Sequence, residues 1–172
     1  EVTAAVIDAD GWFHSGDLGE LDEDAFLRIT GRKKELIVTA SGRNVAPQNI
    51  ERHMQSHPVI SHAVVYGDRQ EFLSALITID EGQLKRWAAE QDVPFTTHAQ
   101  MSQLPGVYKL VESAIDQKNR GLASYETIKK FAILDREMST EAGDLTPTMK
   151  VRRSAIADKY RALLDSFYSD GY

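Results

Sequence analysis

Apolar positions recur along this 172-residue chain at the spacings of short strands and amphipathic helices. Two nearly continuous apolar stretches, VISHAVVYG at 59–67 and FLSALITID at 72–80, predict a pair of strands joined by a turn at Gly67 and Asp68. KKFAIL at 129–134 predicts another strand. Strands and helices alternate irregularly from about residue 35 onward, which predicts a compact α+β or α/β domain of roughly 135 residues.

Helices are predicted where apolar residues fall three and four positions apart. One begins at Pro47 and ends before Pro58, and Asp80 is the expected N-cap of a second. A third begins at Pro105 and should end at Gly121. A single closing helix carries the apolar stripe Ile156, Tyr160, Leu163, Leu164 and Phe167.

The N-terminal residues predict short strands separated by turns, with TAAVI at 3–7, the turn DADG at 8–11, AFLRIT at 25–30 and ELIVT at 35–39. The strands before residue 34 are too few and too short for a stable unit. The chain also begins with Glu1 inside an apolar stretch. We therefore expect a piece of a longer protein, with these strands packed on a larger body.

Composition narrows the class of protein. The net charge is −6 and the pI about 5.4, so no basic footprint for nucleic acid is predicted. The absence of cysteine excludes disulfides, thiolate metal sites and a cysteine nucleophile. No apolar run approaches the roughly 20 residues that span a bilayer. We expect a cytoplasmic protein, and peripheral contact with a membrane stays open.

The first candidate site is GWFHSGDLG at 11–19. Glycines on both sides of Asp17 permit a tight backbone, and an aspartate held there can accept hydrogen bonds from a diol such as a ribose. An Asx-turn that ends a strand is the alternative.

The second is GRKKELIVTASGRN at 31–44. Arg32 offers a fork of donors for sugar or phosphate oxygens, and Lys34 stands where the short strands meet the compact domain. Gly42 permits close approach of a ligand or of another backbone segment. A solvated basic linker is the alternative.

The third is GDLTPTMKVRRSAI at 143–156, in which Pro147 prevents a helix from running through. Lys150 stands just before the last helix, whose positive end disfavours a cation, and Arg152 and Arg153 add like charge. An arriving anion would be favoured here. A lysine in solvent at a helix start is the alternative.

Two other features predict no site. His53 and His57 are spaced like metal ligands on a helix, but no third ligand is evident, so no metal site is predicted. The basic runs DQKNRG and KVRR have no interleaved aromatic residues and predict solvated faces.

In their order and spacing, GWFHSGDLG, GRKKELIVTASGRNVAPQNIE and LTPTMKVRR resemble the C-terminal part of the adenylate-forming superfamily, which holds acyl-CoA synthetases, peptide-synthetase adenylation domains and firefly luciferase. The last motif resembles the long-chain fatty acyl-CoA synthetase branch, although Met149 stands where many relatives carry glycine. The resemblance implies an α+β fold, with residues 1–33 ending a large N-terminal domain and 34–172 forming a mobile lid. That lid is a small mixed sheet flanked by helices, with a helical insertion at about 93–122.

The resemblance also implies residue roles. Asp17 would accept from the ATP ribose hydroxyls, Arg32 would support the same sugar, and Lys34 would be the hinge. Lys150 would reach the fatty carboxylate and the α-phosphate as the acyl-adenylate forms. The loop expected to meet the pantetheine of CoA after rotation is Ser41, Gly42, Arg43 and Asn44.

The implied function is that of an AMP-forming long-chain fatty acid–CoA ligase that uses ATP, Mg²⁺ and CoA. Its N-terminal domain would carry most of the ATP site, so this chain alone should be inactive. Two alternatives stay open: transfer of the acyl group to a carrier protein, and a non-catalytic interaction domain that keeps the fold.

Overall fold

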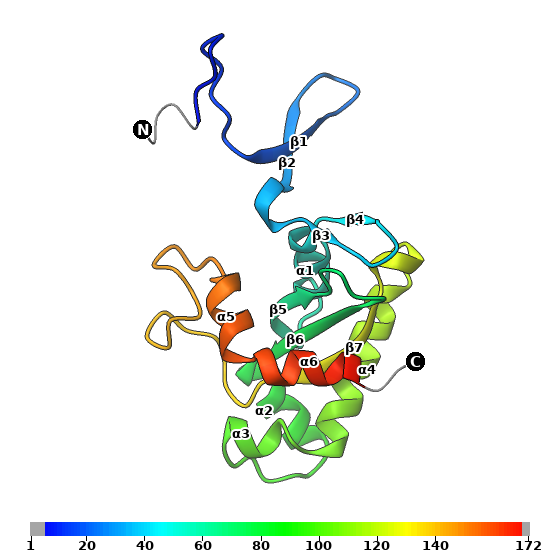
Figure 1. Cartoon of the computed structure of the whole chain (residues 1–172). Coiled ribbons are helices and arrows are strands. Elements are labelled where there is room, and N and C mark those ends of the chain that lie inside the picture. The colour runs from blue at the N-terminus through cyan, green and yellow to red at the C-terminus, as the bar shows by residue number, and fades with distance from the viewer. Residues whose placement is uncertain (1–5, 170–172) are drawn as a thin grey trace.

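The computed structural model describes residues 6–169 of the chain. Figure 1 shows a body of helices around a sheet, from which the N-terminal segment projects. Of the strand expected at 3–7, residues 3–5 lie outside the described part, and Ile7 forms only an isolated antiparallel bridge with Phe13. The DADG turn is present, because the Asp8 carboxylate accepts from the backbone N–H of Asp10 and of Trp12 at 3.0 and 2.9 Å.

A three-stranded mixed sheet forms the centre of the body, as the sequence predicts. Its strands are β5 (Ile60–Tyr66), β6 (Leu73–Ile79) and β7 (Ile128–Ile133), in the order β5-β6-β7. β5 and β6 are antiparallel, whereas β6 and β7 are parallel. Every residue of β6 is buried, which explains its nearly continuous apolar sequence: a strand covered on both faces has no side for solvent.

Helices cover both faces of this sheet. One core cluster contains Ala75 and Ile77 of β6 with buried residues of α1, α2 and α4, whereas Leu76 belongs to a second cluster with α5 and α6. Alternating residues of β6 thus enter opposite layers. The helices are α1 (Pro47–Gln55), α2 (Glu81–Glu90), α3 (His98–Met101), α4 (Pro105–Asn119), α5 (Arg153–Lys159) and α6 (Arg161–Ser169).

Local signals locate three of these helices. Pro47 and Pro105 start α1 and α4, and the Asp80 side chain caps α2 by accepting from the Gln83 N–H at 2.8 Å. α1 ends at Gln55, however, so His57 lies beyond it. α4 ends at Asn119, close to the predicted end at Gly121, and Gly121 is not among the glycines with a positive φ. The short helix α3 was not predicted, although Thr97 caps it by accepting from the Gln100 N–H at 3.3 Å. The 3₁₀ turn η3 (Ser124–Glu126) has no side-chain cap.

The prediction of a single closing helix is wrong. Two helices, α5 and α6, meet at Tyr160, whose φ of −109° and ψ of 19° depart from helical values. Ile156 of α5 and Leu164 of α6 are both buried in the cluster beneath them. The two helices on either side of Tyr160 thus each place one apolar residue in the same cluster.

The N-terminal part contains two small ladders. β1 (Asp17–Leu21) pairs with β2 (Leu27–Arg32), and β3 (Ile37–Val38) pairs with β4 (Asn44–Val45); the 3₁₀ turn η2 (Lys33–Glu35) lies between the ladders. The strand expected at 35–39 is therefore reduced to β3. The β1–β2 hairpin leaves several large apolar side chains exposed, namely Leu21, Phe26, Leu27 and Ile29.

Candidate functional site

A hollow of about 620 Å³ is lined by residues of the β1–β2 hairpin, of α1 and of the segment before α5. The first residue of β1 and the last residue of β2 line it, together with residues from distant parts of the chain. We call it the junction hollow. Its lining includes Asp17, Gly31, Arg32, Glu35, Gln48, Glu51, Arg52, His62, Met149, Lys150 and Arg153.

Asp17 and Arg32 face each other across the hairpin. They are direct partners in the β1–β2 register, and Arg32 Nε lies 2.9 Å from Asp17 Oδ1. Gly16, with a φ of +75°, turns the chain into β1. Among the described contacts the Asp17 carboxylate pairs with Arg32 rather than with a backbone N–H, so the Asx-turn alternative is not observed. Both groups stay partly exposed and available to a polar ligand.

Lys150 lies near the tip of a tight turn rather than at the start of a helix. The Thr146 N–H donates to the Lys150 carbonyl at 2.8 Å, and Leu145 and Val151 form an antiparallel bridge below it. We call residues 144–152 the Lys150 hairpin. Met149 adopts a φ of +61°, a conformation that favours glycine. Within the described chain the Lys150 ammonium has no ion-pair partner, so its charge is available in the junction hollow.

Arg153 corrects the prediction that KVRR is a solvated face. Its Nη2 donates to both carboxylate oxygens of Glu51 at 2.6 Å, and its Nη1 donates to the Val65 carbonyl at 2.9 Å. Glu51 also accepts from the Val65 N–H at 2.7 Å. Burial raises the pKa of Glu51, and the charge and hydrogen bonds of Arg153 oppose that rise.

The sequence held a signal for this buried pair. Glu51 shares the i, i+3, i+4, i+7 stripe of α1 with Pro47, Ile50 and Met54, all of them buried. A carboxylate on an apolar face needs a cation from another element, because an unpaired buried charge is costly. The sequence alone does not show that this cation is Arg153.

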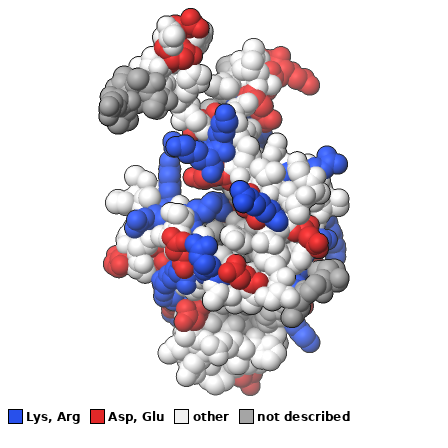
Figure 2. All heavy atoms as spheres, in the orientation of Figure 1, with Lys and Arg blue, Asp and Glu red and all other residues white. Residues whose placement is uncertain are grey.

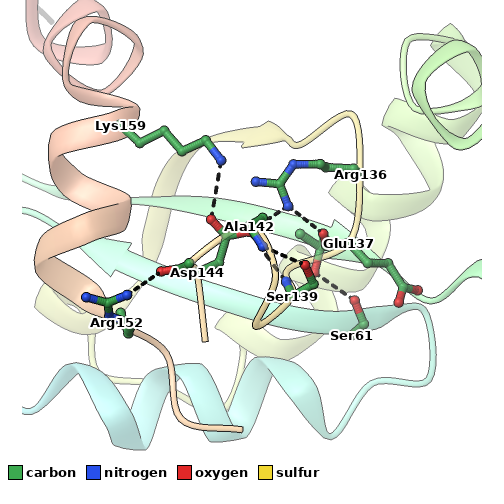
Figure 3. Close-up of polar contacts among 10 residues, drawn as sticks. Ser61, Arg136, Glu137, Ser139, Ala142, Asp144, Arg152 and Lys159 are labelled. Atoms are coloured by element: carbon green, nitrogen blue, oxygen red, sulfur yellow. Dashed lines mark hydrogen bonds and ion pairs between the residues drawn. The ribbon is translucent and has the colours of Figure 1, made fainter. Parts of the chain in front are cut away.

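A second buried carboxylate, Asp144, lies at the base of the Lys150 hairpin (Figure 3). Arg136 Nη1 donates to Asp144 Oδ2 at 2.6 Å, and Lys159 Nζ lies 3.4 Å from Oδ1. Burial alone would raise the pKa of Asp144, but the hydrogen bonds from Arg136 and the Ser139 N–H, with the charges of Arg136 and Lys159, outweigh it and lower the pKa. No sequence motif indicated this cluster.

The other predicted residues lie away from the junction hollow. Lys34 is exposed in η2 and lines a neighbouring cavity of about 760 Å³. Gly42, with a φ of +76°, turns the β3–β4 loop, and its N–H donates to the Thr39 carbonyl at 2.8 Å. Arg43 lies over the Tyr125 ring at 5.5 Å. The structure therefore brings Asp17, Arg32 and Lys150 together but not the loop Ser41, Gly42, Arg43 and Asn44.

The histidine pair has other partners. His53 Nε2 lies 3.0 Å from the Lys118 carbonyl, and His57 is beyond the end of α1. Over residues 6–169 no group of three or more His, Cys, Asp or Glu side chains is arranged to hold a metal ion. No helix in the same range is long and apolar enough to cross a membrane.

Sequence comparison finds a family and named relatives. The family described as AMP-binding enzyme C-terminal domain matches residues 34–171. The long-chain-fatty-acid–CoA ligase FadD15 of Mycobacterium tuberculosis is 45% identical over 163 residues, which cover 93% of this chain and 27% of that ligase. The long-chain-fatty-acid–CoA ligase ACSBG1 of Bos taurus is 40% identical over 186 residues, covering 98% and 26%. The chain thus spans about a quarter of these relatives.

Solved structures show the same fold. The adenylation domain of carboxylic acid reductase from Segniliparus rugosus, in complex with AMP and a co-purified carboxylic acid, superposes with a TM-score of 0.82 at 23% identity, covering 98% of this chain and 25% of that one. The corresponding domain from Mycobacterium chelonae gives 0.79 at 26% identity, with the same coverage. With the family match and the ligase homologues, the conclusion is plain: the chain belongs to the AMP-binding enzyme C-terminal domain family of the adenylate-forming superfamily.

Proposed function

We propose that this chain is the C-terminal part of an AMP-forming long-chain fatty acid–CoA ligase. In this proposal residues 34–172 form the mobile lid, and 1–33 complete the N-terminal domain. The ligase homologues support the reaction class, since adenylate-forming ligases use ATP and CoA. The preceding N-terminal domain would supply most of the ATP site and the fatty acid site, so the chain alone would not catalyse the reaction.

The observation that carries the proposal is that Asp17, Arg32 and Lys150 line one hollow, although they lie far apart in the sequence. The Asp17 carboxylate accepts hydrogen bonds from the ribose hydroxyls of ATP. Arg32, already paired with Asp17 at 2.9 Å, orients that carboxylate and contacts the same sugar. Lys150 then faces the phosphate and carboxylate end of the substrates. The three residues thus suit a nucleotide with an anionic group beyond its sugar.

The charges of the hollow favour such an anion. Arg32 pairs with Asp17, and Arg153 pairs with Glu51 and lies 3.9 Å from Glu35, whereas within residues 6–169 Arg52 and Lys150 have no carboxylate partner. The lining thus carries four cationic and three anionic side chains, a small positive excess. Figure 2 shows Lys and Arg side chains gathered where the projecting N-terminal part meets the body, in a chain whose net charge is −6. The basic character is local, which suits an anionic small molecule better than nucleic acid.

In the first half-reaction the fatty carboxylate oxygen attacks the α-phosphorus of ATP, and the bond to pyrophosphate breaks. Two anions must approach, and the Lys150 ammonium lowers their repulsion and aligns them. In the second, the CoA thiol attacks the acyl carbon and AMP leaves. Rotation about Lys34 withdraws Lys150 and presents the Gly42 loop, which lies outside the junction hollow in this structure.

Magnesium belongs to the proposed reaction as the ion that accompanies ATP. Among residues 6–169 no group of three or more His, Cys, Asp or Glu side chains is arranged to hold a metal ion, and Mg²⁺ that accompanies ATP takes most of its ligands from phosphates and water. We therefore assign Mg²⁺ to the substrate phosphates and the N-terminal domain, and no step here depends on a ligand from this chain.

The test compares wild type and Lys150→Ala in the complete ligase polypeptide, with ATP and palmitate. Pyrophosphate release measures adenylation, and thioester formation from preformed palmitoyl-adenylate and CoA measures the second step. We expect Lys150→Ala to lose about 10²–10³-fold in the first rate, the usual cost of one preorganised contact, and to keep most of the second. Survival of both rates would contradict the role of Lys150.

A wild-type enzyme that releases no pyrophosphate with any fatty acid would contradict the ligase assignment as a whole. Transfer of the acyl group to a phosphopantetheinyl carrier protein, and not to CoA, would leave adenylation in place but change the acceptor.

A further inference from the structure

The Lys150 hairpin is closed by its backbone and fixed at its base. The Arg152 N–H donates to the Asp144 carbonyl at 2.8 Å, and the Thr146 N–H donates to the Lys150 carbonyl at 2.8 Å. The Thr146 hydroxyl also accepts from the Lys150 N–H at 3.1 Å. The backbone at Lys150 is therefore tied to the opposite arm of the hairpin, and its direction depends on how residues 144 and 152 are held.

Asp144 holds that base to two other elements. Its carboxylate, only 3% exposed, lies between Arg136, in the segment after β7, and Lys159, the last residue of α5 (Figure 3). The distances are 2.6 and 3.4 Å, and the Ser139 N–H lies 3.4 Å from the same carboxylate. One side chain thus connects the hairpin to the end of the sheet and to α5.

The other end of the hairpin is fixed independently. Arg153 follows it directly and is held on α1 and β5 by Glu51 and the Val65 carbonyl, at 2.6 and 2.9 Å. Both ends of the hairpin therefore rest on a buried carboxylate paired with arginine. The side chain of Lys150 is exposed between them, with no described ion-pair partner.

Stability alone does not account for a charge at position 144. A buried ion pair stabilises little compared with apolar residues of the same shape, because desolvation offsets the attraction. A hydrogen-bonded carboxylate does define one orientation of the groups it joins, which an apolar contact does not. Placement matters for a catalytic lysine, since a displacement of about 1 Å can cost about 10²-fold in rate.

We propose that Asp144, through Arg136 and Lys159, positions Lys150 for acyl-adenylate formation. Asp144 is a positioning residue: it contacts neither substrate, and it acts by fixing the base of the hairpin. The inference rests on the proposed ligase function and adds to it the residues that hold the catalytic cation in place.

The test uses the complete ligase polypeptide with Asp144→Asn, which keeps the size of the side chain and removes its charge. We expect kcat for palmitate-dependent pyrophosphate release to fall about 10- to 100-fold. The KM for ATP, and thioester formation from palmitoyl-adenylate and CoA, should change less than about two-fold, because Lys150 is not used there. Asp158→Asn is the matched control, since its carboxylate pairs with Arg161 on an exposed surface and neither rate should change.

A double variant separates positioning from a general structural effect. In a Lys150→Ala background, Asp144→Asn should change pyrophosphate release by less than about two-fold, because the group it positions is gone. An equal loss in both backgrounds, or in both half-reactions, overturns the proposal. Failure of the ligase function looks different, because the wild-type enzyme would then release no pyrophosphate with any fatty acid. If only the role assigned to Lys150 is wrong, Lys150→Ala alone leaves pyrophosphate release intact.

If Asp144→Asn does not fold, Lys159→Gln tests the same claim. The Lys159 side chain is 42% exposed, and its substitution leaves the ion pair between Arg136 and Asp144 in place, so this variant should fold. We expect a loss of about three- to ten-fold, confined to adenylation and absent in the Lys150→Ala background. An unchanged adenylation rate in this variant overturns the proposal.

Discussion

Removal of Glu51 should be among the most destabilising single changes in this chain. Glu51→Ala deletes two hydrogen bonds of 2.6 Å that Arg153 donates and one of 2.7 Å that the Val65 N–H donates. It leaves a guanidinium that is only 22% exposed without its carboxylate, and a buried N–H without its acceptor. The backbone acceptor at Val65 stays in place.

The expected cost follows from these groups. Breaking a buried ion pair by removing one partner typically costs about 3–5 kcal/mol. In the variant the Val65 carbonyl still accepts from Arg153 at 2.9 Å, and Glu35 lies 3.9 Å from Arg153 Nε. We therefore expect a loss of stability at the lower end of that range, about 3 kcal/mol. For a domain with a total stability of about 5–15 kcal/mol, this is a large fraction.

Urea unfolding of the 172-residue chain, followed by circular dichroism, measures the loss. The double variant Glu51→Met with Arg153→Met should recover more than half of it, because two apolar side chains leave no unpaired charge. Glu81→Ala is the control: its ion pair with Lys85 is exposed, so the loss of stability should be much smaller than that of Glu51→Ala. A loss below about 1 kcal/mol for Glu51→Ala, or a double variant less stable than either single one, would refute the reasoning.

Two further predictions concern the turn at Met149 and the pH dependence of stability. Met149 has a φ of +61° and is 63% exposed, so urea unfolding should find Met149→Val less stable than Met149→Gly by about 1–2 kcal/mol; the opposite order would contradict the turn. Burial lowers the pKa of His62 below its ordinary 6.5, against the charge of Glu137, so the folded state favours the neutral ring. Its contribution to stability is complete above pH 6.5 and is lost as the pH falls below that value, since the unfolded state then binds the extra proton. His62→Gln should reduce this loss between about pH 7.5 and 5.5; the part that stays is assigned to His57, whose pKa burial also lowers. An NMR titration of His62 with a pKa above 6.5 would contradict the sign.

Much of the fold follows from local patterns. The two central strands, the helix starts at Pro47 and Pro105 and the cap at Asp80 all depend on residues close in the chain. The bend at Tyr160 does not follow from local patterns, because it depends on how Ile156 and Leu164 pack against residues of the sheet. An apolar stripe at helical spacing shows which residues share a face, but not whether one helix or two successive helices carry them.

In the candidate site, too, some features follow from the sequence and others only from the tertiary structure. The sequence by itself determined the chemistry of the individual residues: a carboxylate between glycines at Asp17 and a lone cation after a proline turn at Lys150. Only the tertiary structure decided that both line one hollow, and that Glu51 meets Arg153 across 102 positions. Residue type and spacing specify local conformation and available charge, because those depend on neighbouring residues. Which charges are paired, buried or free depends on how distant segments pack, and that is settled only when the sheet and its helices come together.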